Sequence, residues 1–377
     1  MCGPWDQSHS LMKIAFDHQI FCSQYYGGIS RYFVSTALEM QNKGHDLRVF
    51  APFYINNYLS ELLNPAVKGR YLKKYPPKTS RIFSELNPYL SRRQIGKWRP
   101  NVVHETYFSK TRMAPLNVPT VLTVYDMIHE RFPNTLAAND KTTELKRLAV
   151  ERADHVICIS NSTRNDLIEL FNVRPEKTST VYLASDITPA LILGESQKGV
   201  RPYLLYVGMR SGHKNFSGLI DALVTSPKLK ADFDVVAFGG GAFSEAEEQM
   251  ITAHGFLADQ VRHVKGDDTA LGRLYACAAA FVYPSLYEGF GLPPLEAMAQ
   301  GCPVISSNTS SMPEIIGDAG ELFPPTDLSA VAKAIEAVVY SESRRADLIS
   351  KGRERLKEFS WQKCADQTLA IYQGLHG

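Results

Sequence analysis

The chain has 377 residues, of which 44% are hydrophobic and 21% charged, and its formal net charge is +2. This length exceeds what one hydrophobic core usually supports, so we expect two domains of roughly 150 to 200 residues each. The composition excludes a largely disordered chain, and the near-neutral charge argues neither for nor against an acidic partner.

The six cysteines and the first residues bear on the compartment. The sequence has no C-x-x-C pair and no Cys/His cluster with zinc spacing, so we expect free buried thiols in a reducing cytoplasm. It also lacks a signal-peptide core and any run of about 18 apolar residues. We therefore expect a cytoplasmic protein, with any membrane contact peripheral to the inner face. A second start at Met12 makes residues 1–11 a tag, an upstream start or a loose tail.

In the first half of the chain, short apolar runs alternate with helix-period segments, which is typical of a doubly wound α/β domain. Strands are predicted at 13–18, 46–52, 101–105, 120–126 and 154–160. A helix is predicted over 29–44, closed by Gly44 because glycine readily adopts the left-handed conformation that ends a helix.

The second half restarts the same pattern. Strands are predicted at 203–208, 234–240, 261–265, 279–285 and 302–307. Helices are predicted at 218–226, 269–278, 294–300 and 327–341. The pattern lapses into proline, glycine and polar residues over 185–201, where we place the domain boundary. Ligands of open α/β sheets bind at the carboxyl ends of the strands, so the loops of both domains are expected to face one cleft.

The loop and helix after the strand at 279–285 carry the most informative residues. Gly289 and Gly291 let the backbone approach a ligand, and the helix predicted to begin at Pro294 offers free amides to a phosphate. Glu296 is predicted in the first helical turn, where its carboxylate would interact favourably with the helix dipole. Glu288 lies in the loop beside aromatic residues, where support of the helix does not explain it, so it is a candidate for ligand binding. The alternative is that Glu288 is a solvated surface carboxylate.

Two cations follow the strand at 203–208. Arg210 and Lys214 are four residues apart and precede a predicted helix. Together they would hold a diphosphate between a bidentate guanidinium and a point charge. Each taken alone is more often a solvated surface residue, but their position directly after a strand favours a role in binding.

No metal site is predicted. The D-x-D at 232–234 lies at the start of a strand rather than after one, which places it at the wrong sheet edge for the expected cleft, so we interpret it as a chance match. Asp267 and Asp268 are expected to cap the following helix.

The ordered string Y-E-G-F-G-L-P-x-L-E-A-M-A-x-G-x-P-V-I, with V-G-x-R-x-x-x-K-N upstream, resembles the retaining GT-B glycosyltransferases of family four, also called glycosyl transferases group 1. Three further segments share this resemblance, GGISRYFVSTALEMQNKGHDLRVF, TVLTVYDMIHERFP and FSWQKCADQTLAIY, so it extends over essentially the whole chain from Met12. It implies a GT-B fold with an acceptor-binding domain over 1–190, a sugar-nucleotide domain over 191–359, and a closing helix at 360–377 that packs back on the first domain.

The resemblance also implies roles for individual residues. Glu288 faces the hydroxyls of the donor sugar, Glu296 binds the ribose diol, and Arg210 and Lys214 neutralise the diphosphate, where charge grows at the transition state. The family uses no separate cofactor. The base is read mainly by the backbone at 264–266. The remaining predicted donor-site residues are backbone contacts and glycines: Gly27, Gly28, Val264, Gly266, Gly289, Phe290, Gly291 and Leu292.

The acceptor half is less sharply defined. Asp126 and His129 follow an apolar strand and are predicted to orient the acceptor hydroxyl, although many relatives have His immediately before that Asp, where this chain has Tyr125. His104 and Glu105 are further acceptor candidates, with a structural role as the alternative.

Residues 68–99 form a strongly basic segment, with ten Lys or Arg against the single acid Glu85. Interleaved aromatic residues give the segment an interfacial character, and anionic lipid attracts such segments by about 1 kcal/mol per nearby cation. A solvated basic loop is the alternative. Nucleic acid is not expected, because no known binding motif accompanies the charge.

The sequence thus predicts a retaining, metal-independent glycosyltransferase that moves a hexose, with a lean to mannose, from a GDP- or UDP-sugar to a glycan or lipid-linked acceptor in surface polysaccharide or lipopolysaccharide biosynthesis. A GT-B sugar-nucleotide epimerase and a catalytically silent sugar-nucleotide-binding protein are the alternatives. A dinucleotide-dependent oxidoreductase fits poorly, because no G-x-G-x-x-G follows the first strand.

Overall fold

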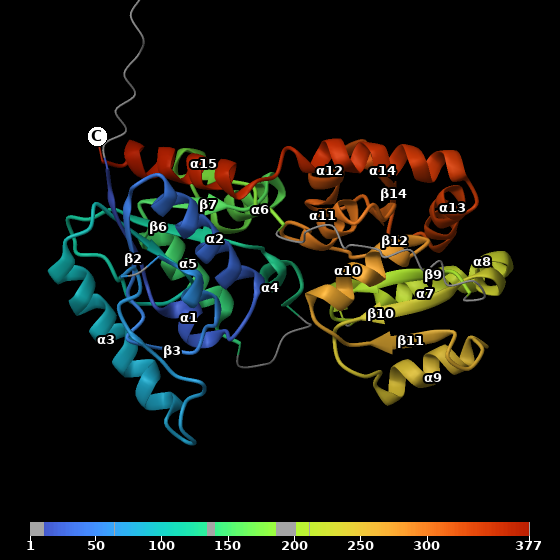
Figure 1. Ribbon diagram of the computed structural model, residues 1–377, viewed down its shortest axis with the longest axis horizontal. Coiled ribbons are helices and arrows are strands. Elements are labelled where there is room, and N and C mark those ends of the chain that lie inside the picture. Colours follow the sequence, from blue (N-terminus) through green and yellow to red (C-terminus); the bar gives the residue numbers. More distant parts are fainter. Residues whose placement is uncertain (1–10, 64, 134–139, 186–200, 211, 377) are drawn as a thin grey trace, which may run out of the picture.

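The computed structural model describes residues 11–63, 65–133, 140–185, 201–210 and 212–376. It contains two large parallel sheets in separate lobes, joined near the middle of the molecule (Figure 1). The interpretation of the N-terminal extension falls almost entirely on residues 1–10, and the boundary predicted in 185–201 falls mostly on 186–200. Both therefore lie outside the described residues.

Among the described residues, the first sheet has six strands in the order β2-β1-β5-β6-β7-β8. They are β1 (Lys13–Phe16), β2 (Asp46–Val49), β5 (Val102–Glu105), β6 (Thr120–Val124), β7 (His155–Cys158) and β8 (Thr178–Thr180). All neighbouring strands are parallel, for example with Ile14 opposite Val102. A short parallel pair beside it consists of β3 (Phe53–Tyr54) and β4 (Arg70–Tyr71).

The second sheet, counted over the same described part of the chain, has six strands in the order β11-β10-β9-β12-β13-β14. They are β9 (Tyr203–Val207), β10 (Asp234–Phe238), β11 (Val261–Val264), β12 (Ala280–Tyr283), β13 (Val304–Ser307) and β14 (Gly320–Phe323). The central strands β9 and β12 are buried along their whole length, as expected for parallel strands covered by helices on both faces. All ten predicted strands are confirmed, whereas β3, β4, β8 and β14 were not predicted.

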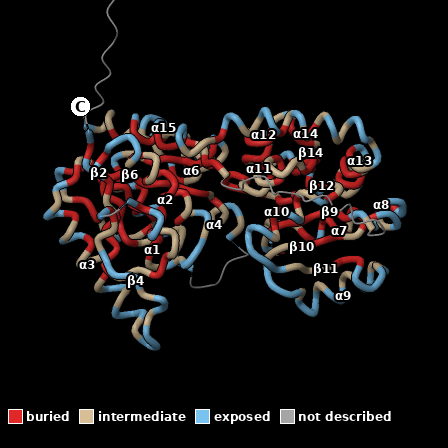
Figure 2. Tube along the Cα trace, viewed as in Figure 1, coloured by how far each residue is buried: buried red, intermediate tan, exposed pale blue. Residues whose placement is uncertain are grey.

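Helices cover both sheets, and their outer faces are exposed while the central strands are buried (Figure 2). In the first lobe the α-helices are α1 (Gln19–Ser23), α2 (Gly28–Asn42), α3 (Ser80–Trp98), α4 (Ile128–Arg131), α5 (Thr142–Arg152) and α6 (Asn161–Phe171). In the second they are α7 (Phe216–Thr225), α8 (Pro227–Asp232), α9 (Glu245–Ala253), α10 (Asp268–Cys277), α11 (Leu292–Ala299), α12 (Met312–Ile316), α13 (Leu328–Val339) and α14 (Glu342–Leu356). Short 3-10 turns are η1 (Tyr58–Glu61), η3 (Pro175–Lys177), η4 (Gly212–Lys214) and η5 (Gly317–Ala319).

The predicted helices are present, and the capping of α2 follows the expected chemistry. Helix α2 ends at Asn42, and Gly44 has φ +88°, in the left-handed region that favours glycine. Helix α3 was not predicted. The helix contains Pro88, and only Asn87, Ser91 and Ile95 along it are buried. Its sequence therefore lacks the regular apolar stripe by which an amphipathic helix is predicted.

The last helix, α15 (Trp361–Gly374), packs against α2 of the first lobe. The Tyr372 hydroxyl lies 2.5 Å from Nδ1 of His104, and Lys43 forms an ion pair with Asp366 at 2.8 Å. In Figure 1 this helix crosses back over the first lobe. The chain therefore passes between the lobes twice.

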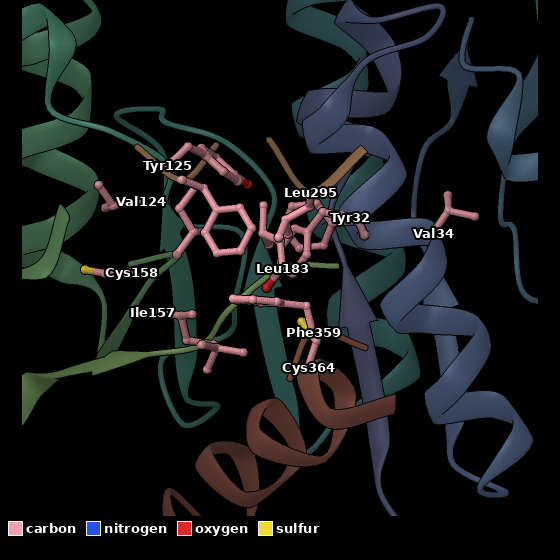
Figure 3. Packing of buried hydrophobic residues seen from close by; sticks show 14 of the residues in the cluster. Tyr32, Val34, Val124, Tyr125, Ile157, Cys158, Leu183, Leu295, Phe359 and Cys364 are labelled. Atoms are coloured by element: carbon pink, nitrogen blue, oxygen red, sulfur yellow. The ribbon is translucent and has the colours of Figure 1, made fainter. Parts of the chain in front are cut away.

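One hydrophobic cluster extends from the first lobe into the second. In Figure 3, Tyr32 of α2 and Leu295 of α11 are members of this cluster, together with Leu183 and Phe359. Close by, Phe290 packs against Phe359 with ring centroids 5.9 Å apart. This apolar contact fixes α11 and the loop before it against the first lobe.

Candidate functional site

Two loops predicted to bind the donor meet where the strand order of the second sheet reverses. Strands β9 and β12 are neighbours, and the chain runs outward from them to β11 on one side and to β14 on the other. Ligands of open α/β sheets bind at such switch points, outside the carboxyl ends of the strands. The loop after β9 carries Arg210 and Lys214, and the loop after β12 carries Glu288.

Lys214 and Glu288 form an ion pair in these loops. Nζ of Lys214 lies 2.7 Å from Oε1 and 2.9 Å from Oε2 of Glu288, and it donates to the Tyr283 hydroxyl at 3.3 Å. The Glu288 side chain is only 8% exposed. Its backbone amide donates to Ser310 at 2.8 Å, and Ser311 donates to its carbonyl at 2.9 Å. The predicted donor-site pair is thus brought together on a loop anchored at several points.

Arg210 is more fully engaged than Lys214. Its Nε donates to Glu247 at 2.7 Å, Nη1 donates to the Gly239 carbonyl at 2.8 Å, and Nη2 donates to the Ala242 carbonyl at 2.9 Å. The guanidinium also lies 4.8 Å from the centre of the Phe243 ring. Arg210 therefore holds the loop between β10 and α9 in this structure, and its predicted contact with a diphosphate stays a prediction.

The first residues of two helices approach each other where the Glu288 loop ends. Helix α2 begins at Gly28 and α11 at Leu292, and a Cβ placed on Gly28 would lie 3.7 Å from Cδ1 of Leu292. Helix N-termini carry unpaired amides and a partial positive charge. Because the Glu288 loop leads directly into α11, the two N-termini and Lys214 make this region suited to a diphosphate.

The glycines of the second loop serve the contact between the lobes as well. A Cβ on Gly289 would lie 1.9 Å from the Tyr125 carbonyl oxygen, so no other residue fits. The Gly289 carbonyl accepts hydrogen bonds from Ser160 at 2.6 Å and Thr163 at 3.1 Å. Gly291 has φ +108° at the N-cap of α11, a conformation that favours glycine. The backbone of Phe290 lies between them, where Ser311 donates to its carbonyl at 2.9 Å.

Glu296 lies beyond the first turn of α11, because the helix begins at Leu292 rather than at Pro294 as predicted. Its Oε2 accepts a hydrogen bond from the Tyr275 hydroxyl at 3.1 Å. Burial raises the pKa of Glu296 to about 7, and the Tyr275 hydrogen bond only partly opposes this. Stabilisation by the helix dipole falls off within the first turn, so that explanation of Glu296 is disfavoured.

The predicted base-binding backbone follows β11. Val264 ends the strand half-buried, and Gly266 is exposed in the loop before α10. A Cβ on Gly266 would lie 2.6 Å from that of Ala270, which accounts for glycine at this position. Asp267 caps α10 by accepting from the Ala270 amide at 2.9 Å, as expected.

The predicted acceptor residues of the β6–α4 segment lie at the contact between the lobes. Asp126 accepts from the Ile128 amide at 3.0 Å, and its Cβ would be 2.9 Å from one placed on Gly289. Nε2 of His129 lies 3.5 Å from Asp140, and its Nδ1 is buried with no partner among the described residues. Asp126 is thus on the side of the first lobe that faces the Glu288 loop.

His104 and Glu105 lie inside the first lobe. Both ring nitrogens of His104 are engaged, one by Tyr372 and the other by Thr123 at 2.8 Å. Burial lowers the pKa of His104 to about 3, so the ring is neutral. Glu105 is fully buried, accepts from the Met113 amide at 2.9 Å and pairs with Arg152. This placement favours the structural alternative for both residues over contact with an acceptor.

Both aspartates of the D-x-D are engaged by other side chains, so neither carboxylate is left unpaired for a metal ion. Asp232 accepts from the Tyr340 hydroxyl at 2.8 Å, and Asp234, the first residue of β10, pairs with Arg262 at 2.7 Å and Arg201 at 3.4 Å. Over the described ranges, no group of three His, Cys, Asp or Glu has a metal-binding arrangement.

Sequence reasoning missed two partners at the site, Glu247 and Tyr275. The S-x-x-E spacing of Ser244 and Glu247 does predict a capping box, which the structure contains at the start of α9. That signal reveals the helix start but not the contact with Arg210. Nothing in the sequence marked Tyr275 as the partner of Glu296, because the contact joins two helices.

The basic segment is exposed on the first lobe. Three of its exposed cations, Lys73, Lys74 and Lys78, precede α3, and three, Arg81, Arg92 and Arg93, lie along it. The apolar side chains Ile82 and Tyr89 of this helix are 61% and 63% exposed. No helix within the described residues is both long and apolar enough to cross a bilayer.

Comparison with known proteins gives two family matches. Residues 26–188 match the model described as Glycosyltransferase Family 4, and residues 194–355 match the model described as Glycosyl transferases group 1. The two matches fall on the two lobes. Together they extend over the helix N-termini and the ion pair described above.

Individual relatives agree with these matches. The O-antigen chain mannosyltransferase B of Escherichia coli is 33% identical over 235 residues, which are 60% of this chain and 62% of the relative. The solved sucrose-phosphate synthase from Thermosynechococcus elongatus superposes with a TM-score of 0.75 at 20% identity, over 97% of this chain and 99% of that one. Anabaena Alr3699/HepE, solved with UDP and glucose, gives 0.70 at 18% identity, over 96% and 99%.

The alignments with the curated relatives are partial. They span 62%, 56% and 33% of the length of three of these relatives. The solved structures are below 25% identity, so they bear on the fold alone, which is the GT-B arrangement of two Rossmann-like domains.

Proposed function

We propose that this chain, which belongs to the glycosyl transferases group 1 family, transfers a hexose from a nucleotide-diphosphate sugar to a glycan or lipid-linked acceptor. One observation carries the proposal: the N-termini of α2 and α11 approach each other, and α11 follows directly on the loop that holds Glu288 against Lys214. Paired helix N-termini and a cation suit a diphosphate, and a carboxylate held next to them suits the hydroxyls of the attached sugar.

In this proposal the bound donor replaces the contact between Lys214 and Glu288 with its own contacts to each of them. The diphosphate takes the Lys214 ammonium, and the sugar hydroxyls donate to the Glu288 carboxylate. The acceptor oxygen then bonds to the anomeric carbon while the bond from that carbon to the phosphate oxygen breaks, and its electron pair leaves with the diphosphate. The acceptor proton passes to the departing diphosphate. Lys214 and the helix amides stabilise the charge that grows there.

Retention of configuration and independence of divalent metal are part of the proposal. Both are supported by the family resemblance, and the second also by the cations and helix amides at the predicted diphosphate position. A transfer assay with purified donor and acceptor tests them. We expect an unchanged rate in chelator and a product with the donor's anomeric configuration. Activity lost in chelator and restored by magnesium or manganese would contradict metal independence.

For the donor we propose GDP-mannose, because relatives of this chain are named mannosyltransferases. Bare nucleotides and sugar nucleotides are compared by thermal shift, since a ligand at 100 times its dissociation constant adds about 2.7 kcal/mol of apparent stability. An epimer formed from donor alone, without any acceptor, would favour the epimerase alternative and contradict transfer.

For the acceptor side we propose that residues 68–99 dock on an anionic membrane surface during surface polysaccharide synthesis. Exposed cations around α3, with Ile82 and Tyr89 exposed among them, support this. Replacing Lys73, Lys74, Lys78 and Arg81 by Ser should weaken co-sedimentation with phosphatidylglycerol vesicles. Equal binding by the Ser variant would refute the docking surface.

A further inference from the structure

Helix α6 of the first lobe holds the second lobe on both sides of Glu288. The Tyr287 hydroxyl donates to Oδ2 of Asp166, in the second turn of α6, at 2.5 Å. The Gly289 carbonyl accepts from two hydroxyl groups at the start of the same helix. One end of one helix therefore contacts both the residue before Glu288 and the residue after it.

The Asp166 carboxylate is shared between Tyr287 and Arg131. Nη2 of Arg131 lies 2.5 Å from Oδ1 of Asp166, so the two carboxylate oxygens serve different partners. The Asp166 side chain is 13% exposed, and Tyr287 is buried. Burial and the Asp166 carboxylate raise the pKa of Tyr287, so its hydroxyl stays protonated and donates. A hydrogen bond to a charged acceptor is about twice as strong as a neutral one, which makes this a firm contact between the lobes.

Arg131 extends this contact to the predicted acceptor segment. It is the last residue of α4, the short helix that follows Asp126. It also donates to Glu169, one turn beyond Asp166 on α6, at 2.6 Å. In Figure 1, α4 and α6 both lie on the side of the first lobe nearest to the second. The segment that follows β6 and the Glu288 loop are thus attached to one helix through one carboxylate.

The position of the Glu288 carboxylate depends on how its backbone is held. In the proposed reaction the donor takes Lys214 from Glu288, so the carboxylate then loses a contact that fixes its side chain. Bonds within the second lobe hold the backbone on one side. The bonds of Tyr287 and Gly289 to α6 fix it relative to the first lobe, where the proposed acceptor binds. Because a misplacement of about 1 Å can cost about 100-fold in rate, these bonds bear on turnover.

We propose that Asp166 is a positioning residue for the transfer, which acts through Tyr287 to place the Glu288 carboxylate against the acceptor. The inference rests on the proposed function and adds a first-lobe residue that itself touches neither donor nor acceptor. The alternative is that Asp166 only stabilises the contact between the lobes. The two differ in their consequences, because a positioning contact changes the Glu288 loop and kcat, whereas a merely stabilising one changes the free energy of unfolding alone.

The first test is hydrogen exchange of the full chain without donor or acceptor, read by mass spectrometry. Tyr287→Phe and Asp166→Asn each remove the hydrogen bond with little change of shape, and two variants serve in case one fails to fold. We expect the amides of residues 285–291 to exchange about 3- to 10-fold faster in both. Tyr340→Phe is the matched control, because it also removes a tyrosine hydroxyl bonded to an aspartate, at 2.8 Å. It should leave the exchange of the loop unchanged.

The second test is steady-state transfer with the same variants. Tyr287→Phe and Asp166→Asn should each lower kcat about 10- to 100-fold, while KM for the donor and the affinity for the bare nucleoside diphosphate stay near those of wild type. The double variant should lose no more than the weaker single variant, because both substitutions break the same contact. Tyr340→Phe should keep the wild-type kcat.

Other outcomes overturn the inference. Wild-type exchange of the loop in both variants would show that Asp166 does not hold it. A lower free energy of unfolding with unchanged kcat would leave Asp166 a stabilising role only, and weaker nucleotide binding with unchanged kcat would assign it to the donor. Failure of the proposed function differs from these results, because it shows in wild type as no transfer from any sugar nucleotide. The exchange of the loop then still decides whether Asp166 positions Glu288.

Discussion

Glu288 and Glu296 lie at the two ends of one short segment, and their carboxylates have opposite surroundings. Glu288 lies against the Lys214 ammonium at 2.7 Å, in a loop fixed by Ser310 and Ser311. Glu296 faces a neutral partner, Tyr275, and burial raises its pKa to about 7. One glutamate is thus paired with a cation, and the other has no cation to offset its burial. This difference suggests separate tasks, with Glu288 serving the chemical step and Glu296 serving nucleotide binding.

The largest effect is expected for Glu288→Gln. The amide keeps the shape of the side chain but removes the negative charge that faces the sugar as positive charge develops at the anomeric carbon. Losing one such group typically costs about 100- to 1,000-fold in kcat. We expect a fall of that order in steady-state transfer, with the fold checked by circular dichroism. A kcat within a few-fold of wild type would remove Glu288 from the chemical step.

Lys214→Ala should also act mainly on kcat, because leaving-group charge grows during transfer. Loss of a charge-assisted contact costs about 1.5 to 3 kcal/mol, or about 10- to 150-fold. The variant also leaves Glu288 without its cation. Steady-state kinetics separate kcat from KM, and a raised KM with unchanged kcat would show that Lys214 contributes uniform binding only.

Arg210→Ala sharpens the comparison by testing the other cation four residues away. Its three donor groups stabilise the loop between β10 and α9, so we expect a loss of about 1 to 3 kcal/mol in the free energy of unfolding, measured in urea. The Arg210 side chain is only 3% exposed, so these contacts are shielded from solvent. A free energy of unfolding equal to that of wild type would contradict a structural task for Arg210.

The last comparison concerns the pH dependence of stability. The pKa of Glu296 rises from 4.5 to about 7 on folding, so the folded protein favours the protonated carboxyl. The contribution of the protonated Glu296 carboxyl to the free energy of unfolding is complete below pH 4.5 and is lost as the pH rises through about 7. Glu296→Gln removes this loss. Its free energy of unfolding should therefore fall less than that of wild type between pH 4.5 and 7, and parallel pH profiles would contradict the assignment.

Much of the fold follows from local sequence. Buried strands such as 203–207 and 280–283 are continuous apolar runs. Gly44 follows α2 because the left-handed backbone conformation there favours glycine. The sequence predicted that Lys214 and Glu288 belong to one donor site, because each follows a strand, but it did not predict their ion pair. The pair forms because β9 and β12 are neighbours in the sheet.

Other features depend on contacts that no local pattern encodes. Arg210 has its partner on α9, Glu296 on α10, and Gly289 meets the first lobe. His104 and Glu105 follow an apolar run, as the predicted donor-site residues do, yet α15 and Arg152 cover them. The direction of a side chain at a strand end depends on what packs over it, and that is decided by distant parts of the chain.

Calorimetric titration of the bare nucleoside diphosphates GDP and UDP into wild type, Glu288→Gln and Glu296→Ala tests the division of tasks most directly. The account predicts that Glu288→Gln binds the preferred nucleotide nearly as tightly as wild type. Glu296→Ala should bind it about 10- to 100-fold more weakly, because the ribose diol loses its carboxylate. Abolished binding in Glu288→Gln, or unchanged binding in Glu296→Ala, would contradict it.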